Sequence, residues 1–245
     1  MSATHEELAA VAGALSGVVT QRRGRRDYHL GKLRGVEVVA AFSRWGKVAA
    51  AATVTQLISA YGAERIVFSG VAGAVQSGVA IGDVVVASEL LQHDMDASPL
   101  YPRYEIPLLG KARFATDSEL RTRLTLAARA FLTHDMASAV PQSELSAFRI
   151  HAPKVVGGLV ASGDRFFADA NEVALLRQRL PGVACVEMEG AAVAQVCDEY
   201  RIPFAIVRTI SDSADESAVH DFPRFSREIA GRYSLGILAR FLEEL

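Results

Sequence analysis

The sequence predicts an α/β protein in which helices cover both faces of a central sheet, giving three layers in a single domain over residues 1–245. Helix-like and strand-like stretches alternate along the chain, which is the pattern of a layered α/β architecture. The last strand candidates are near-continuous apolar runs, and such strands are buried on both faces. A chain of 245 residues with 50% hydrophobic composition is long enough to bury one large core.

Periodicity and turn residues place the elements in order. A helix is expected over residues 5–15 with Gly17 as its stop, and an Ala-rich helix from Gly46 to Tyr61 ends at Gly62. The expected strands are Val36–Phe42, Arg65–Ser69, Asp83–Ser88, Val155–Ala161, Val183–Val186 and Phe204–Thr209. Further helices are expected at about 117–132, 169–179, 190–200 and 221–243. Residues 92–113 contain three prolines and no clear period, which predicts a long loop of the kind that often carries function.

Charge and composition exclude several functional classes. The chain has 26 basic and 28 acidic residues, a balance that argues against nucleic-acid binding. The basic run Arg22–Arg26 is interrupted by Gly24 and is expected to form a solvated turn before a strand. Cys185 and Cys197 lie in apolar stretches without metal-ligand spacing, which predicts buried, reduced thiols and no metal. No apolar run approaches the ~18 residues of a membrane span, and the N-terminus lacks the pattern of a secretory signal, so we expect a cytoplasmic protein.

Ligands of such sheets bind beyond the carboxyl ends of the strands, and two of these ends are rich in small or aromatic residues. The segment Gly70–Ala74 would let backbone N–H groups approach a ligand closely, although it lacks the spacing of a dinucleotide-binding turn. Phe166 and Phe167 follow another strand. They either stack on a planar base, at about 1–3 kcal/mol for each contact, or fill the core under a loop.

Two further strand ends carry acids. Glu187 and Glu189 end a buried strand, where carboxylates are costly unless they bind something, and one of the two is expected to sit at a helix N-terminus. Asp212 follows the last strand and is either a general acid or a helix-capping or turn residue. Together with the two strand ends described above, four strand ends with unusual residues lie in one sheet, and they predict a single ligand site.

As an ordered set, the motifs resemble those of the 5'-methylthioadenosine/S-adenosylhomocysteine nucleosidases of the nucleoside phosphorylase superfamily. The motifs that carry the resemblance are Ser43–Ala52 with its Gly46-Lys47-Val48-Ala49 core, Gly82–Val86, Ser162-Gly163-Asp164 with Phe166, Val186–Glu189 and Arg208–Asp212. The resemblance implies a mixed, barrel-like sheet flanked by helices and a homodimer. It also implies hydrolysis of the N-glycosidic bond of an adenine nucleoside without metal or cofactor, with 5'-deoxyadenosine as a further candidate substrate.

The resemblance also implies a role for each matching residue. Asp212 would protonate adenine N7 with Ser211 holding its carboxyl, Glu7 would activate the attacking water, and Glu189 would bind the ribose hydroxyls. The other implied pocket residues are Met188 near the sugar, Val71, Ala72 and Gly73 near the water and sugar, Phe166 stacked on adenine, the Phe167 backbone at the adenine edge, Phe222 as a lid, and Trp45 narrowing the pocket. Leu100, Tyr101 and Pro107 on the long loop would reach the neighbouring subunit's pocket.

Three alternatives to this hydrolase remain open. A purine nucleoside phosphorylase on the same fold needs donors for phosphate, but Phe68 stands where the related phosphorylases carry arginine. A nucleosidase for another adenine nucleoside, such as aminodeoxyfutalosine, would differ only in the pocket for the 5' group, and a third alternative is a nucleoside-binding protein without activity. The family's apolar first strand is missing before Glu7 in this sequence. We therefore expect Glu7 to be poorly anchored and the protein to be less active or less stable.

Overall fold

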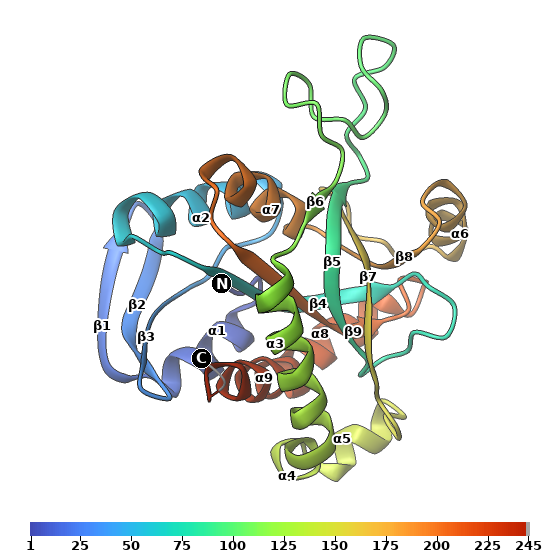
Figure 1. Ribbon diagram of the computed structural model, residues 1–245. Helices are drawn as coiled ribbons and strands as arrows, with labels where there is room; N and C mark the ends of the chain where they lie inside the picture. Colours follow the sequence, from blue (N-terminus) through green and yellow to red (C-terminus); the bar gives the residue numbers. More distant parts are fainter. Residues whose placement is uncertain (244–245) are drawn as a thin grey trace.

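Two β-sheets organise the computed structural model, which describes residues 1–243 (Figure 1). The smaller sheet is an antiparallel meander of β1 (Ser16–Arg23), β2 (Arg26–Leu33) and β3 (Val36–Ala41). The turn between β1 and β2 falls inside the basic run Arg22–Arg26, and its Gly24 has a φ of +59°. This exposed turn confirms the expectation for the basic run, although the sequence analysis set no bounds for β1 and β2.

The larger sheet closes on itself into a barrel. Its strands are β4 (Ile66–Ala74), β5 (Val84–Gln92), β7 (Val155–Ser162), β8 (Val183–Glu187) and β9 (Phe204–Asp212), with the short β6 (Phe114–Ala115) beside β5. The pairs β4–β9, β5–β7 and β7–β8 are parallel, whereas β4–β8 and β5–β9 are antiparallel. The expected mixed, barrel-like sheet is therefore confirmed.

Helices cover the barrel on two sides. The helical segments are α1 (His5–Gly13), α2 (Lys47–Tyr61), α3 (Ser118–Ala130), η1 (Phe131–Asp135), α4 (Met136–Ala139), α5 (Gln142–Ala147), α6 (Ala170–Arg179), α7 (Gly190–Tyr200), α8 (Ala218–Phe225), η2 (Ser226–Ala230) and α9 (Gly231–Glu243). One apolar cluster joins the barrel to α2 and α7, and a second joins it to α3 and α9 (Figure 1). The apolar strands thus lie between two helical layers, as predicted.

Tertiary pairing moves some of the expected boundaries. The segment Gly70–Ala74 is not a turn after a strand but the second half of β4, because its residues pair with β9 and, at Gly73 and Ala74, also with β8. Strand β9 likewise continues to Asp212. The last helical region begins at Ala218 instead of residue 221, and a π-helical turn interrupts it before α9.

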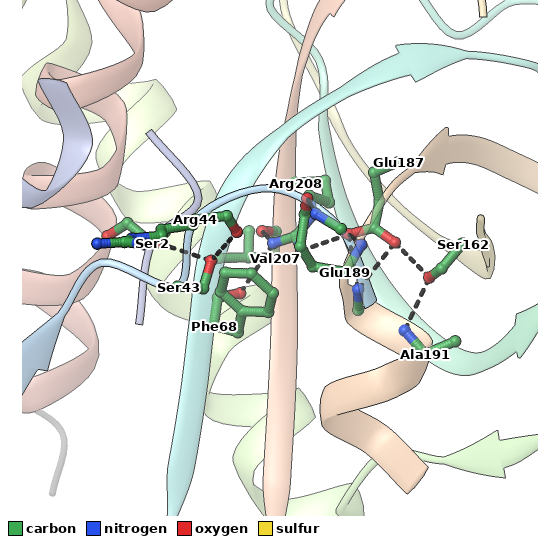
Figure 2. Close-up of polar contacts among 12 residues, drawn as sticks. Ser2, Ser43, Arg44, Phe68, Ser162, Glu187, Glu189, Ala191, Val207 and Arg208 are labelled. Carbon is green, nitrogen blue, oxygen red and sulfur yellow. Dashed lines mark hydrogen bonds and ion pairs between the residues drawn. The ribbon is translucent and has the colours of Figure 1, made fainter. Parts of the chain in front are cut away.

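The first residues fill part of the space between β3 and β4. Ser2 forms parallel β-bridges with Phe42, directly after β3, and with Ser69 of β4. The Ser69 N–H also donates to the Met1 carbonyl at 3.1 Å. The Ser43 hydroxyl donates to the Ser2 carbonyl at 3.2 Å (Figure 2). Since these contacts tie down the segment that leads into α1, the expectation of a poorly anchored Glu7 is wrong.

The long loop over residues 93–113 projects far from the barrel (Figure 1). Leu100 and Leu108 in this loop are 84% and 92% exposed. Within residues 1–243, no helix combines the length and the apolar character needed to cross a membrane.

Candidate active site

A cavity opens at the carboxyl ends of β4, β8 and β9 and beside the turn that follows β7. The sequence-predicted residues that line it are Trp45, Val71, Ala72, Gly73, Phe166, Phe167, Met188, Glu189, Ser211, Asp212 and Phe222. Ala3, Thr4, Arg165, Val186, Glu187 and Ala214 complete the lining. The barrel therefore brings residues as far apart in the sequence as Ala3 and Phe222 into one site.

Asp212 ends β9 with its carboxyl group held from two sides. The Ser211 hydroxyl donates to Oδ2 at 2.7 Å, and the Ala214 N–H donates to Oδ1 at 2.8 Å. Burial raises the pKa of Asp212, although these two hydrogen bonds lower it in part. A Cβ atom on Gly73 would lie 2.9 Å from Oδ1, so a residue without a side chain lets the carboxyl sit against β4. The result is a positioned carboxyl group whose protonated form is favoured by burial, as a general acid requires.

Glu187 is the structural member of the two neighbouring acids. Its carboxylate accepts the Gly190 N–H at 2.8 Å at the start of α7 and pairs with the Arg208 guanidinium at 2.6 Å. The Ser162 hydroxyl also donates to it, as Figure 2 shows. Since its exposed fraction is only 7%, these partners are what make its charge tolerable in the interior.

Glu189 remains available to a ligand. Its side chain accepts a hydrogen bond from the Gly46 N–H, which donates to Oε1 at 2.7 Å. Burial, and then the neighbouring Glu187, raise the pKa of Glu189 to about 8. A buried carboxyl on the cavity wall can accept hydrogen bonds from ligand hydroxyls. Glu189 precedes α7, but the Glu187 carboxylate accepts the N–H at the start of this helix, so the expectation that one of the two acids binds a helix N-terminus is confirmed for Glu187.

Aromatic rings form one side of the cavity mouth. Phe222 lies edge-on to Phe166 at 5.6 Å between ring centroids and edge-on to Trp45 at 5.7 Å. Phe167 instead turns inward against His93 at 5.3 Å and is 9% exposed, whereas Phe166 is 39% exposed. The sequence left open whether these two rings face a ligand or fill the core. In the structure the Phe166 ring faces the cavity side, and the Phe167 ring fills the core.

Glu7 does not line the cavity, although the sequence placed it among the catalytic residues. It is fully buried, with Oε2 accepting from the Thr4 hydroxyl at 2.9 Å and Oε1 accepting from the Ser234 hydroxyl at 3.0 Å. Thr4 also caps α1 by accepting the Glu7 N–H at 3.3 Å. Burial raises the pKa of Glu7, and the Thr4 hydrogen bond lowers it in part. Thr4 on the cavity wall therefore stands next to the Glu7 carboxyl.

Leu100, Tyr101 and Pro107 do not line this cavity either. They belong to the long loop over residues 93–113, and none of them is among the lining residues. These three residues therefore do not contribute to the cavity of the chain that carries them.

The sequence reasoning assigned no role to Arg208, although it supports the site. The side chain is 1% exposed, stacks over the Phe68 ring at 4.1 Å and donates to the Phe68 carbonyl at 3.3 Å. A single arginine inside the apolar run Phe204–Thr209 was the available signal, because a buried guanidinium requires a buried acid. Its acid is Glu187.

Cations and metal ligands are scarce in the site. Of the lining residues, which all fall within the described 1–243 stretch, only Arg165 is cationic, and its guanidinium pairs with Glu172. In the same stretch, no group of three or more His, Cys, Asp or Glu side chains is arranged to hold a metal ion.

Comparisons with known proteins agree with this geometry. A family model described as "Phosphorylase superfamily" matches residues 1–243. A "5'-methylthioadenosine/S-adenosylhomocysteine nucleosidase" from Bacillus thuringiensis (strain Al Hakam) is 32% identical over 246 residues, covering 100% of this chain and 97% of the relative.

Solved structures give the same result. The nucleosidase of that name from Neisseria meningitidis, in complex with methylthio-immucillin-A, aligns with a TM-score of 0.87 and 33% identity over 100% of this chain and 97% of its own. A futalosine hydrolase of Helicobacter pylori strain 26695 aligns with a TM-score of 0.83 and 30% identity over 100% of this chain and 96% of its own.

Proposed function

The chain belongs to the phosphorylase superfamily and, within it, to the 5'-methylthioadenosine/S-adenosylhomocysteine nucleosidases, and from this we propose that it hydrolyses the N-glycosidic bond of these two adenine nucleosides. The products are adenine and the 5'-substituted ribose. The observation that carries the proposal is the buried Asp212 carboxyl, fixed by Ser211 and Ala214 on the wall of a cavity that also holds Glu189.

In the proposed reaction Asp212 gives its proton to N7 of adenine as the bond to the ribose breaks. Adenine then leaves as a neutral base, and positive charge develops on the sugar ring. Glu189 accepts hydrogen bonds from the ribose hydroxyls and, in its ionised form, places negative charge next to that ring, while the Phe166 ring stacks on the base. General acid catalysis of this kind contributes about 10²–10⁴-fold to a rate, and the fixed carboxylates add electrostatic stabilisation of the transition state.

Water is the proposed nucleophile. Phosphate would need cationic partners, yet Arg165 pairs with Glu172, and Arg208 is buried against Glu187 and the Phe68 carbonyl. Glu7 is proposed as the base for the water from its position behind Thr4. These observations favour a hydrolase over a phosphorylase.

Two candidates remain for the substituent at the 5' position of the substrate. The futalosine hydrolase of Helicobacter pylori is as similar in fold as several nucleosidases, so a nucleosidase for an aminodeoxyfutalosine-like substrate is the second candidate. The rim formed by Trp45 and Phe222 is apolar, which favours a small apolar 5' group such as methylthio over a charged one.

We also propose a homodimer in a reducing compartment such as the cytoplasm. The support for the dimer is the projecting loop, where Leu100 and Leu108 are almost fully exposed and Tyr101 and Pro107 are partly exposed. The support for the compartment is that both cysteines are free and buried.

The test is adenine release from 5'-methylthioadenosine with and without phosphate, for the wild type and Asp212→Asn. Phosphate-independent release that falls by at least a hundred-fold in the variant supports the proposal. Release only with phosphate would make the protein a phosphorylase, and equal release by both proteins would remove Asp212 as the acid.

A further inference from the structure

Three chain segments that are distant in sequence meet beside the cavity mouth through a ring of hydrogen bonds. They are the start of α2 at Lys47, the base of the projecting loop at Asp94 and the turn after β7 at Asp164. The Lys47 ammonium binds Asp94 Oδ1 at 2.6 Å, and Asp94 Oδ2 accepts the Asp164 N–H at 2.9 Å. Asp164 Oδ1 accepts the Lys47 N–H at 2.8 Å, which closes the ring. None of the three residues lines the cavity itself.

An ordinary surface ion pair does not account for this arrangement. Exposed pairs contribute about 0–1 kcal/mol and are readily screened, but the Lys47 side chain is only 17% exposed and that of Asp94 is 32% exposed. Burial alone would raise the pKa of Asp94, yet the hydrogen bonds from Lys47 and Asp164 hold it below its usual value. The carboxylate is therefore engaged by both partners at once.

This hydrogen-bonded ring adjoins two groups of the site in sequence. Lys47 follows the residue whose N–H binds the Glu189 carboxyl, and Asp164 lies two positions before Phe166, which is proposed to stack on adenine. Gly46, which precedes Lys47, donates its N–H to Glu189 Oε1 at 2.7 Å. Gly46 has a φ of +91°, and a Cβ atom there would lie 3.0 Å from Asp164 Oδ1, so little space separates this backbone from the ring. Phe166 follows Asp164 by two residues on the same turn.

We propose that Lys47 and Asp94 are positioning residues, which hold the Gly46 N–H on Glu189 and the Phe166 turn beside the cavity, and which tie both to the base of the projecting loop. This inference rests on the proposed function. The mechanism is geometric: when the Lys47–Asp94 pair is lost, the start of α2 and the turn after β7 separate, and the Gly46 donor moves off Glu189. Displacements of about 1 Å in such contacts can reduce a rate by up to a hundred-fold.

The pKa of Glu189 provides a measurement that tests this proposal, because a general loss of stability would not change that pKa. The charged groups that act on it are Glu187 on β8, Arg208 on β9 and Glu7 on α1, besides the Gly46 N–H. Substitution of Lys47 or Asp94 leaves those three groups in place. Because the Gly46 hydrogen bond lowers the pKa of Glu189, its loss raises that pKa and moves the acid limb of the pH profile of kcat/KM to higher pH.

The loop supplies a matched control at its other end. Lys111 pairs with Asp198 of α7 at 2.8 Å, so Lys111→Met also removes a lysine–aspartate pair from this loop, but away from the cavity. We expect Lys47→Met and Asp94→Asn each to lower kcat/KM by about ten-fold, and the double variant to lose no more than either single one. Lys111→Met should stay within two-fold of the wild type, and Lys47→Arg should recover most of the activity.

Trp45 provides a measurement that does not depend on turnover. It is the only tryptophan in the sequence and precedes Gly46, so its fluorescence reports directly on the start of α2. Lys47→Met should change the Trp45 emission and weaken adenine binding in a fluorescence titration, whereas Lys111→Met should change neither. If the wild type releases no adenine, the proposed function fails and this titration still tests the positioning role. Equal kcat/KM, acid limb and Trp45 signal in Lys47→Met, Lys111→Met and the wild type would overturn the proposal.

Discussion

Replacing Glu189 with glutamine should make the protein more stable at alkaline pH while reducing its activity. The two side chains have the same shape, and the glutamine Oε1 can still accept the Gly46 N–H at the position where Glu189 accepts it. The substitution removes only the ionisable group. Burial and the neighbouring Glu187 raise the pKa of that group from 4.5 to about 8 in the folded protein.

The size and sign of the effect follow from these two pKa values. Between pH 4.5 and 8 the unfolded chain has released the proton of Glu189, whereas the folded protein still holds it. Unfolding therefore releases a proton, and the free energy of unfolding falls as pH rises through this window. The difference of 8 − 4.5 = 3.5 pKa units corresponds to roughly 5 kcal/mol at most. Relaxation around the buried charge reduces this, so we expect about 2–4 kcal/mol.

The assay is urea denaturation of the wild type and Glu189→Gln at intervals from pH 4 to pH 9. Other groups titrate in both proteins, so the difference between the two curves isolates Glu189. We expect the difference to be near zero at pH 4 and to grow in favour of the variant up to pH 9. A constant difference across the range would refute the argument, since it would mean that Glu189 ionises equally in both states. Adenine release should fall in the same variant, most of all above pH 8, where the ribose hydroxyls lose a charged acceptor.

Further predictions concern the rest of the site. Arg208→Met should lower the free energy of unfolding by about 3–5 kcal/mol, because it leaves the Glu187 carboxylate buried without its ion pair. Urea denaturation checks this, and adding Glu187→Gln to it should recover part of the loss. Ser211→Ala should raise the pKa of Asp212 by removing a hydrogen bond to its charged form, so the alkaline limb of the pH profile should move to higher pH. An unmoved limb would show that another group controls it. Phe166→Leu should raise KM for 5'-methylthioadenosine by about ten-fold with little change in kcat if the ring only stacks on the base, and steady-state kinetics will show whether kcat falls instead.

Local residues account for the elements that the sequence predicted well. The Ala-rich helix ends at Gly62 because that glycine adopts the left-handed conformation of a helix C-terminus, with a φ of +64°. The strands of the barrel were visible as apolar runs because both of their faces are buried. The mixed, barrel-like arrangement of those strands came from the resemblance alone, since no local pattern records which strands pair.

Other features depended on contacts between distant residues. Arg208 of β9 pairs with Glu187 and not with Glu189. This contact makes Glu187 the acid that supports the structure. The burial of Glu7 depended on Ser234 of the last helix, 227 positions away.

The sequence by itself thus determined the fold class, the order of its main elements and most of the polar and aromatic residues that line the cavity, because these follow from composition, periodicity and motif; it did not identify Thr4 or Arg165. Tertiary structure alone decided the roles within that set. It turned Phe167 into the core and Phe166 toward the cavity, and it placed Glu7 behind Thr4. The physical reason is that the burial and hydrogen-bond partners of a polar side chain come from strands and helices that only barrel closure brings together.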